Sequence, residues 1–207
     1  VNVPSGGHWG ISNVGGQLGG FDMDTLKELP MATTSRNYID GYRDYQASGP
    51  NEMNSGFGLY ANGGNSVPYG NYELYLMGLI SPEELKDVVY FEDIATTTPN
   101  TFYECGGVEG TGSGCFTARK KVTLTAEKII EELGERVPDY ATAQKEFRIL
   151  TAVITPSPLT EKEISEVHDQ ITWFSNPKDD NSALFNFFEA TGGRATLKAD
   201  DLGASLK

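Results

Sequence analysis

Turn-forming residues recur through the first 68 residues and limit what this part of the chain can fold into. The signals are Ser5-Gly6-Gly7, Gly15-Gly16, Gly19-Gly20, Asn62-Gly63-Gly64 and Val67-Pro68. Glycine and proline at this density favour turns, so we expect no long regular element here. Loops this long in a compact domain usually carry function or pack against another part of the protein.

The chain is strongly acidic. Among its 207 residues, 29 are Asp or Glu and 16 are Lys or Arg, which gives a formal net charge of -13. Such a charge repels phosphate backbones and anionic lipid, so we expect neither nucleic acid nor membrane surfaces as partners. No apolar run reaches the length of a membrane span. The start at Val1, without Met or a signal-peptide pattern, is interpreted as processed or truncated.

Apolar spacing and capping residues predict the elements that follow. A buried helix is expected over residues 69–80, with Tyr72, Tyr75, Leu76 and Leu79 on one face, and Ser81-Pro82-Glu83-Glu84 should start a second, short helix. We further predict a strand over 116–124, a helix over 125–133 ending at Gly134, and a helix from Asp139 through Phe147.

The last third of the chain shows the same kinds of signals. The β-rich run 148–155 predicts a central strand. Thr160-Glu161-Lys162-Glu163 is a capping box for a helix to about Phe174, and a last helix is expected over 184–190. The capped helix should bury a stripe made of Ile164, Val167, Ile171 and Phe174.

These elements predict a mixed α+β fold. Its irregular Gly/Tyr-rich N-terminal half, residues 1–96, should pack on helices near 69–90. A loop at 97–115 should separate it from a smaller α/β unit at 116–207. That loop contains both cysteines, Cys105 and Cys115, and its glycines let it bend enough for a disulfide. A disulfide suits a secreted or periplasmic protein, and two reduced thiols are the alternative.

Two residues are candidate metal ligands. Glu73 is a lone carboxylate in an otherwise aromatic and aliphatic helix, and a buried carboxylate needs a metal, an ion pair or hydrogen bonds. His8 lies among glycines beside Trp9, where it could bind a metal or make structural hydrogen bonds. His168, on a regular capped helix, is interpreted as structural or exposed.

Two further groups are candidates for binding. Tyr42 and Tyr45 belong to an aromatic-rich region that could bind protein or glycan, or could pack within the fold. The acids of Asp22-Met23-Asp24 and Asp179-Asp180 are hard oxygen ligands that suit calcium, but neither run has the calcium-loop pattern, and solvated turns are the simpler interpretation.

Several segments together resemble secreted bacterial putative zinc metallopeptidases with an HExxH helix. The most specific is Tyr72-Glu73-Leu74-Tyr75-Leu76-Met77-Gly78-Leu79 with Ser81-Pro82-Glu83-Glu84; the others are Gly-Gly-His8-Trp9 with Gly-Gly-Gln-Leu-Gly-Gly, Gly134-Glu135-Arg136-Val137-Pro138 with Gln144-Lys145-Glu146-Phe147-Arg148, and Ala190-Thr191-Gly192-Gly193-Arg194-Ala195. The resemblance spans nearly the whole chain. It implies that His8 and Glu73 occupy positions downstream of the HExxH helix.

The chain departs from this family because it contains no HExxH. Neither His8-Trp9 nor His168-Asp169 begins one. The resemblance therefore implies the C-terminal portion of a zinc endopeptidase, a hydrolase of protein or peptide substrates that is inactive alone. Zinc would bind only with an upstream HExxH fragment of the same precursor as partner. The alternative is a noncatalytic extracellular module that binds protein or glycan, with calcium as a further candidate ion.

Overall fold

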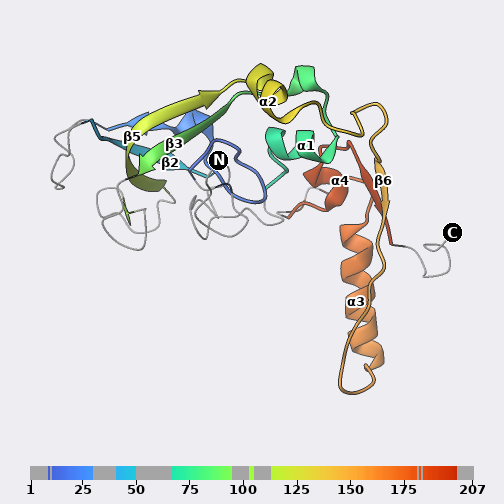
Figure 1. Cartoon of the computed structure of the whole chain (residues 1–207). Helices are drawn as coiled ribbons and strands as arrows, with labels where there is room; N and C mark the ends of the chain where they lie inside the picture. Colours follow the sequence, from blue (N-terminus) through green and yellow to red (C-terminus); the bar gives the residue numbers. More distant parts are fainter. Residues whose placement is uncertain are drawn as a thin grey trace.

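The computed structural model describes residues 9, 11–29, 41–49, 67–94, 103–104, 113–180, 182 and 184–199. Within these residues the fold is mixed α+β, as predicted. Figure 1 shows an elongated body, with a sheet at one end, short helices in the middle, and one long helix that projects away from the body.

An antiparallel sheet forms one end of the body. It contains β1 (Lys27–Glu28), β2 (Arg43–Ser48), β3 (Val88–Ile94), β4 (Tyr103–Glu104) and β5 (Ser113–Leu124), with β1-β2-β5-β3 side by side and β4 also paired with β5. The strand predicted over 116–124 is confirmed as the central strand β5. Its neighbours β2 and β3 both precede the loop predicted at 97–115, within which lie β4 and the first three residues of β5, so the sheet combines segments from either side of the predicted boundary.

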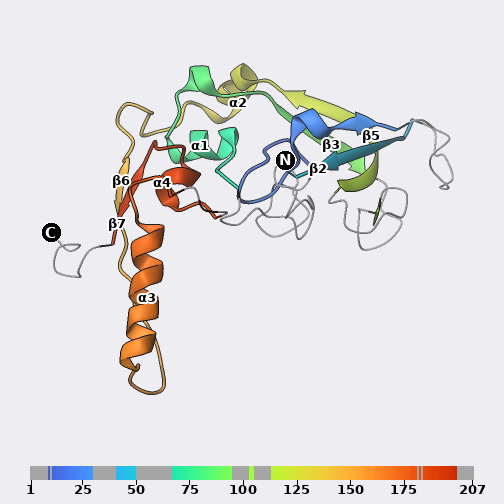
Figure 2. The ribbon, with the colours of Figure 1, turned by 180° about the vertical axis from the view of Figure 1, so that it is seen from behind.

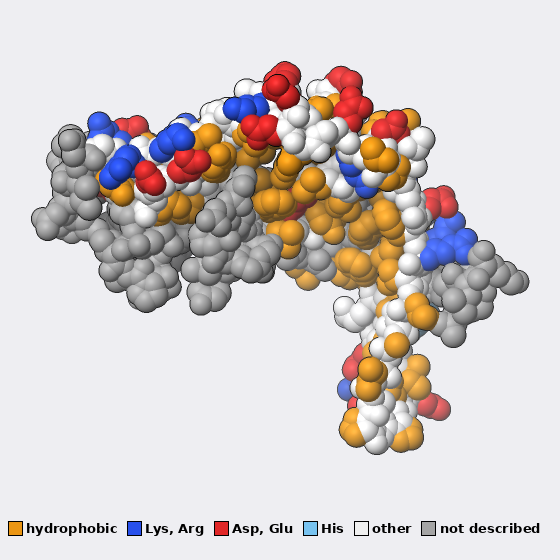
Figure 3. All heavy atoms as spheres, in the orientation of Figure 1, with side chains coloured by type: hydrophobic (Ala, Val, Ile, Leu, Met, Phe, Trp, Pro, Cys, Tyr) orange, Lys and Arg blue, Asp and Glu red, His pale blue; other side chains and the backbone are white. Residues whose placement is uncertain are grey.

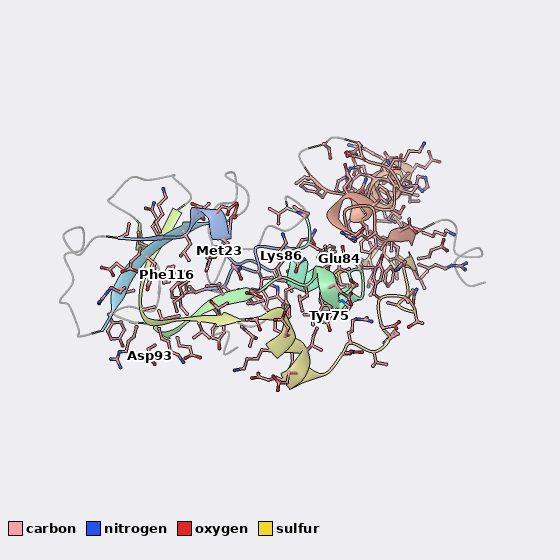
Figure 4. All side chains as sticks on the ribbon, turned by 90° about the horizontal axis from the view of Figure 1, so that it is seen from above. Met23, Tyr75, Glu84, Lys86, Asp93 and Phe116 are labelled. Atoms are coloured by element: carbon pink, nitrogen blue, oxygen red, sulfur yellow. The ribbon has the colours of Figure 1, made fainter. Side chains whose placement is uncertain are left out.

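The apolar core of the sheet is aromatic. Phe21 and Phe116 are fully buried, and Tyr45 and Phe91 lie against Phe116 with ring centroids 5.4 and 4.8 Å away. Strand pairing places Tyr45 of β2 directly beside Phe116 of β5. Figure 4 labels Phe116 within the sheet and Tyr75 at the helical part of the body, which has a core of its own.

The helical part confirms the capping predictions. Helix α1 (Asn71–Met77) lies within the range predicted over 69–80 but ends earlier, at Gly78, which has a φ of 76°. The 3-10 helix η5 (Pro82–Glu84) follows with Ser81 as its N-cap, as predicted. Helix α2 (Ala126–Leu133) starts after Thr125, whose side chain caps it, and ends at Gly134. A second core joins these elements; its buried members are Val14, Tyr75, Ile80, Leu85, Val88 and Ile129. Leu76, predicted on the buried face of α1, is instead 44% exposed.

The helix predicted from Asp139 through Phe147 is wrong. The Asp139 carboxylate accepts hydrogen bonds from the Thr142 backbone N–H and hydroxyl, which closes a turn, and residues 146–148 form β6 (Glu146–Arg148). This strand pairs in parallel with β7 (Thr196–Lys198). The side-chain bond and the strand pairing together outcompete the helix. Helix α4 (Phe187–Ala190) packs nearby, shorter than the helix predicted over 184–190.

The prediction of a central strand at 148–155 is also wrong. Only Arg148 of this run lies in a strand, and Ile154 is 98% exposed. Helix α3 (Glu161–Phe174) and its Thr160 capping box are confirmed, but none of its residues is buried, and Ile164 is 54% exposed. We call residues 149–175 the arm. Figures 1 and 2 show, from opposite sides, that its extended segment runs beside α3 and that both project from the body. Of the predicted stripe, Val167, Ile171 and Phe174 are partly buried, and Phe174 packs against Phe187 of α4 with ring centroids 6.3 Å apart. Ile164, at the far end of the arm, stays exposed.

Of the helices described, α3 is the longest, and none has both the length and the apolar composition needed to cross a membrane.

Candidate functional site

Glu73 lies in the first turn of α1 and is 5% exposed. Its Oε1 accepts hydrogen bonds from Trp9 Nε1 at 2.8 Å and from the Leu18 N–H at 3.0 Å. Its Oε2 accepts from the Gln17 N–H at 3.0 Å and from the Gly70 N–H at 2.8 Å. We call Glu73 and these donors the Glu73 site. It joins the loop at residues 9–21 to the start of α1.

The loop reaches Glu73 through a tight turn. Gly16 and Gly19 exchange two backbone hydrogen bonds of 3.1 and 3.0 Å, which leaves the N–H groups of Gln17 and Leu18, between them, directed at the carboxylate. A Cβ on Gly16 would lie 1.9 Å from Glu73 Oε2, closer than any real contact. The Gly15-Gly16 signal therefore reflects a close approach to Glu73 as well as a turn.

The four donors account for the acceptor capacity of Glu73. An ionised carboxylate offers about four lone-pair directions, and each is matched here by one N–H group. A bond from Glu73 to a metal would have to replace one of these hydrogen bonds. Of the three interpretations left open by the sequence, a metal, an ion pair or hydrogen bonds, this arrangement is the hydrogen-bonded one, in which Glu73 positions the loop.

Trp9 is held on two sides. Its backbone N–H donates to the Leu18 carbonyl at 3.0 Å, and its ring lies edge-on to Tyr72 with centroids 5.4 Å apart. His8, the residue before Trp9, lies outside the described residues. Its position in the chain next to Trp9 connects it covalently to the Glu73 site.

The described residues do not fit a zinc ion on their own. No group of three or more His, Cys, Asp or Glu side chains among them could hold a metal. Glu73 is already saturated by N–H donors. Any zinc ligands would therefore have to come largely from elsewhere.

A polar pocket of about 340 Å³ adjoins the Glu73 site. Gly70, Tyr72 and the acids Asp22, Asp24 and Asp87 help to line it. Two of these acids hold local structure, since Asp22 caps the 3-10 helix η1 (Met23–Thr25) and Asp87 accepts from the Ala126 N–H at 3.1 Å. In Figure 4, Met23 and Lys86, which also line the pocket, are labelled on different segments. Calcium stays a hypothesis for the Asp22-Met23-Asp24 run.

The second acidic run forms a hydrogen-bonded turn. Asp180 accepts from Trp173 Nε1 at 2.9 Å and from the Ser182 N–H at 2.9 Å. The hydrogen bonds from Ser182, and secondarily from Trp173, lower the pKa of the Asp180 carboxyl. These contacts give the carboxylate a structural role in the turn after α3.

The two tyrosines proposed as binding contacts lie in different environments. Tyr42 is half-buried, and the Arg119 guanidinium lies 4.7 Å from its ring centroid. Tyr45 is 7% exposed and packs against Phe91 and Phe116. A ligand contact by Tyr45 would require this core to open, whereas Tyr42 could be reached from the surface.

The remaining sequence candidates lie away from the Glu73 site. Cys115 is 1% exposed in β5 and is not a free thiol. Cys105 lies outside the described residues, so the pairing of the two stays a prediction. His168 is exposed on α3, with Thr172 Oγ1 3.5 Å from its Nε2.

The pKa of Tyr69 is raised by burial and by the nearby charge of Glu73. Burial raises the pKa of the Tyr69 hydroxyl above 10.0, and Glu73 raises it further. The pKa of Tyr69 is therefore higher in the folded than in the unfolded protein, where it is about 10. The neutral hydroxyl contributes fully to the free energy of unfolding below about pH 10, and this contribution is lost as the pH rises through the pKa of the folded protein. Tyrosinate absorbance should therefore show a component titrating above pH 10 that Tyr69→Phe removes. A removed component that titrates at or below 10 would contradict the described position of Tyr69.

Sequence reasoning singled out Glu73 and His8-Trp9 but missed the groups that complete the site. These are the backbone N–H groups of Gln17, Leu18 and Gly70. The Gly70 contact had a local signal, because a carboxylate three residues after an N-cap commonly reaches back to the cap N–H. The other two had none, since they come from a turn more than 50 residues away.

The Glu73 site thus consists of one buried carboxylate that binds a distant glycine-rich turn and an indole. No family model, curated protein or solved structure matches this chain.

Proposed function

We propose that this chain is the C-terminal portion of a secreted zinc metalloendopeptidase and is inactive alone. The observation that carries the proposal is the 2.8 Å hydrogen bond from Trp9 to Glu73. It joins the two sequence segments, 64 residues apart, that hold the candidate positions His8 and Glu73. Convergence of these segments is what a shared site requires.

In this proposal Glu73 is a positioning residue. Its four hydrogen bonds fix the loop that begins at Trp9, and therefore the place where the chain leaves toward His8. The two histidines and the glutamate of an HExxH helix would come from an upstream segment of the same precursor, as the family resemblance implies. Zinc, when bound there, would supply an activated water for hydrolysis of a peptide bond.

The test is the intact mass and metal content of the protein purified from its natural source, with any noncovalently associated chain retained. Zinc together with an upstream HExxH-bearing segment is the expected result. His8→Ala in that precursor should lower its zinc content, whereas His168→Ala, on the exposed face of α3, should leave it unchanged. Equal zinc content in the two variants would exclude His8 as a ligand.

A noncatalytic extracellular module that binds protein or glycan is the second candidate. The exposed apolar side chains of the arm favour it, because apolar patches on a protein surface commonly mark interaction sites. A single metal-free chain of 22.5 kDa in the natural material would support this candidate over the peptidase.

A further inference from the structure

The arm exposes apolar side chains at unusual density. Within residues 150–164, Leu150 is 59% exposed, Val153 47%, Ile154 98% and Ile164 54%. In Figure 3 hydrophobic side chains gather along the projecting arm. Large aliphatic side chains in this arrangement stabilise a protein only when another surface covers them.

The backbone N–H and C=O groups of residues 150–154, in the extended half of the arm, make no backbone hydrogen bonds to other described residues. Among the described residues, the last backbone bond before this segment runs from the Ile149 N–H to the Lys198 carbonyl at 3.0 Å, and none is found for 150–154. The segment continues directly from β6, and its sequence, Leu-Thr-Ala-Val-Ile, is rich in β-branched residues. Such a strand edge is a template for pairing with another extended chain.

The helical half of the arm needs support as well. Helix α3 has 14 residues, none of them buried. A helix of about 12 to 15 residues is marginal in water unless its apolar face is packed. The stripe of Ile164, Val167 and Ile171 therefore gains most from an additional contact, and the extended segment beside α3 (Figures 1 and 2) exposes the same kind of surface.

Charge indicates the chemistry of the missing partner. Helix α3 carries four acids against the single cation Lys162. Glu166 pairs with Lys162 at 3.6 Å and Glu163 accepts from Thr160, which leaves Glu161 and Asp169 as the acids best placed to meet a partner. The whole chain has a formal charge of -13, so a second copy would bring like charges together. A basic partner would gain from the same field.

We propose that the arm binds an extended segment of a partner protein, rich in β-branched and basic residues, which adds a strand along residues 150–154. Backbone hydrogen bonds supply the affinity, the exposed aliphatic side chains are covered, and the acids of α3 select lysine or arginine. The proposal does not depend on the peptidase proposal, because it uses no residue of the Glu73 site.

The experiment uses the complete 207-residue chain and a labelled synthetic peptide that alternates valine with lysine. Fluorescence anisotropy should detect binding of this peptide, and amide hydrogen exchange at 150–154 should slow when it binds. A valine–glutamate peptide should not bind. The valine–lysine peptide methylated on alternate backbone nitrogens, which keeps its charge but cannot pair as a strand, should bind at least about tenfold more weakly.

Chain variants separate strand addition from general attraction to an acidic protein. Ile154→Ser changes a side chain that is 98% exposed, so folding should be unaffected, while binding weakens about tenfold. Ala152→Pro removes one backbone donor from the segment and should weaken binding similarly. Leu133→Ser, at a position 69% exposed on α2, is the matched control and should leave binding unchanged.

Three results would overturn the proposal. Equal binding of the methylated and unmethylated peptides would show that charge alone attracts them. Equal binding to Ile154→Ser and wild type would place the contact elsewhere. A concentration-dependent dimer that Ile154→Ser abolishes would make a second copy of the chain the occupant of the arm.

Discussion

Glu73→Ala is expected to lower the free energy of unfolding by about 3 to 5 kcal/mol. The carboxylate is 5% exposed and accepts from Trp9, Gln17, Leu18 and Gly70. Its removal leaves these donors without an acceptor in a site mostly closed to water, and each such loss costs about 1 to 3 kcal/mol when the donor stays buried. Urea denaturation followed by circular dichroism measures the loss.

Two variants make this result specific. Glu73→Gln keeps the shape but replaces one acceptor oxygen by an NH₂ group that faces backbone N–H donors, so it should lose most of the same free energy. Glu131→Ala removes an exposed carboxylate of α2 and should change stability by less than about 0.5 kcal/mol. A Glu73→Ala variant as stable as Glu131→Ala would show that the loop does not depend on this carboxylate.

Local signals were enough to locate most of the helices. Thr160 caps α3, Ser81 is the N-cap of η5, and Gly134 ends α2. Each of these features acts within one helical turn, so a few consecutive residues encode it. The strand β5 was predictable for a similar reason, because its β-branched and aromatic residues favour an extended chain.

The partners of these elements were not predictable. The amphipathic pattern of α3 correctly marks a helix with one apolar face, but a pattern cannot say whether anything covers that face, and Ile164 is exposed. The run 148–155 has strand propensity, yet the neighbouring strand β7 ends at Lys198. Only Arg148, the first residue of the run, therefore has a pairing partner in β7. Propensity describes one chain segment, whereas pairing depends on two.

At the Glu73 site, too, the local feature was predictable from the sequence and its distant partners were not. A lone carboxylate in an apolar helix correctly signalled a buried group that needs compensation, and Glu73 is such a group. The identity of its donors depends on the turn at Gly16–Gly19, which reaches α1 only in the folded chain. Sequence reasoning therefore identified the acceptor and left the donors open.

Phe116→Ala is expected to have an effect of similar size, about 3 to 5 kcal/mol, through a different mechanism. Phe116 is fully buried in the central strand β5 and packs against the rings of Tyr45 and Phe91, which also contact each other. Truncation removes the apolar contact area and leaves a cavity that the paired strands β2 and β3 cannot close by moving together. Phe116→Leu, which fills part of this space, should lose clearly less.

A surface control and a double variant with Glu73→Ala show whether the loss of stability in Phe116→Ala comes from the core of the sheet. Leu133→Ala, at a position 69% exposed, should change stability by less than about 0.5 kcal/mol. Phe116 belongs to the core of the sheet, whereas Trp9, which donates to Glu73, packs against the second core, so the double variant should lose about the sum of the two single losses, within about 0.5 kcal/mol. A much smaller loss of unfolding free energy in the double variant would mean that the sheet and the Glu73 site unfold as separate units. A loss below about 1 kcal/mol in Phe116→Ala alone would contradict the described packing of the sheet core.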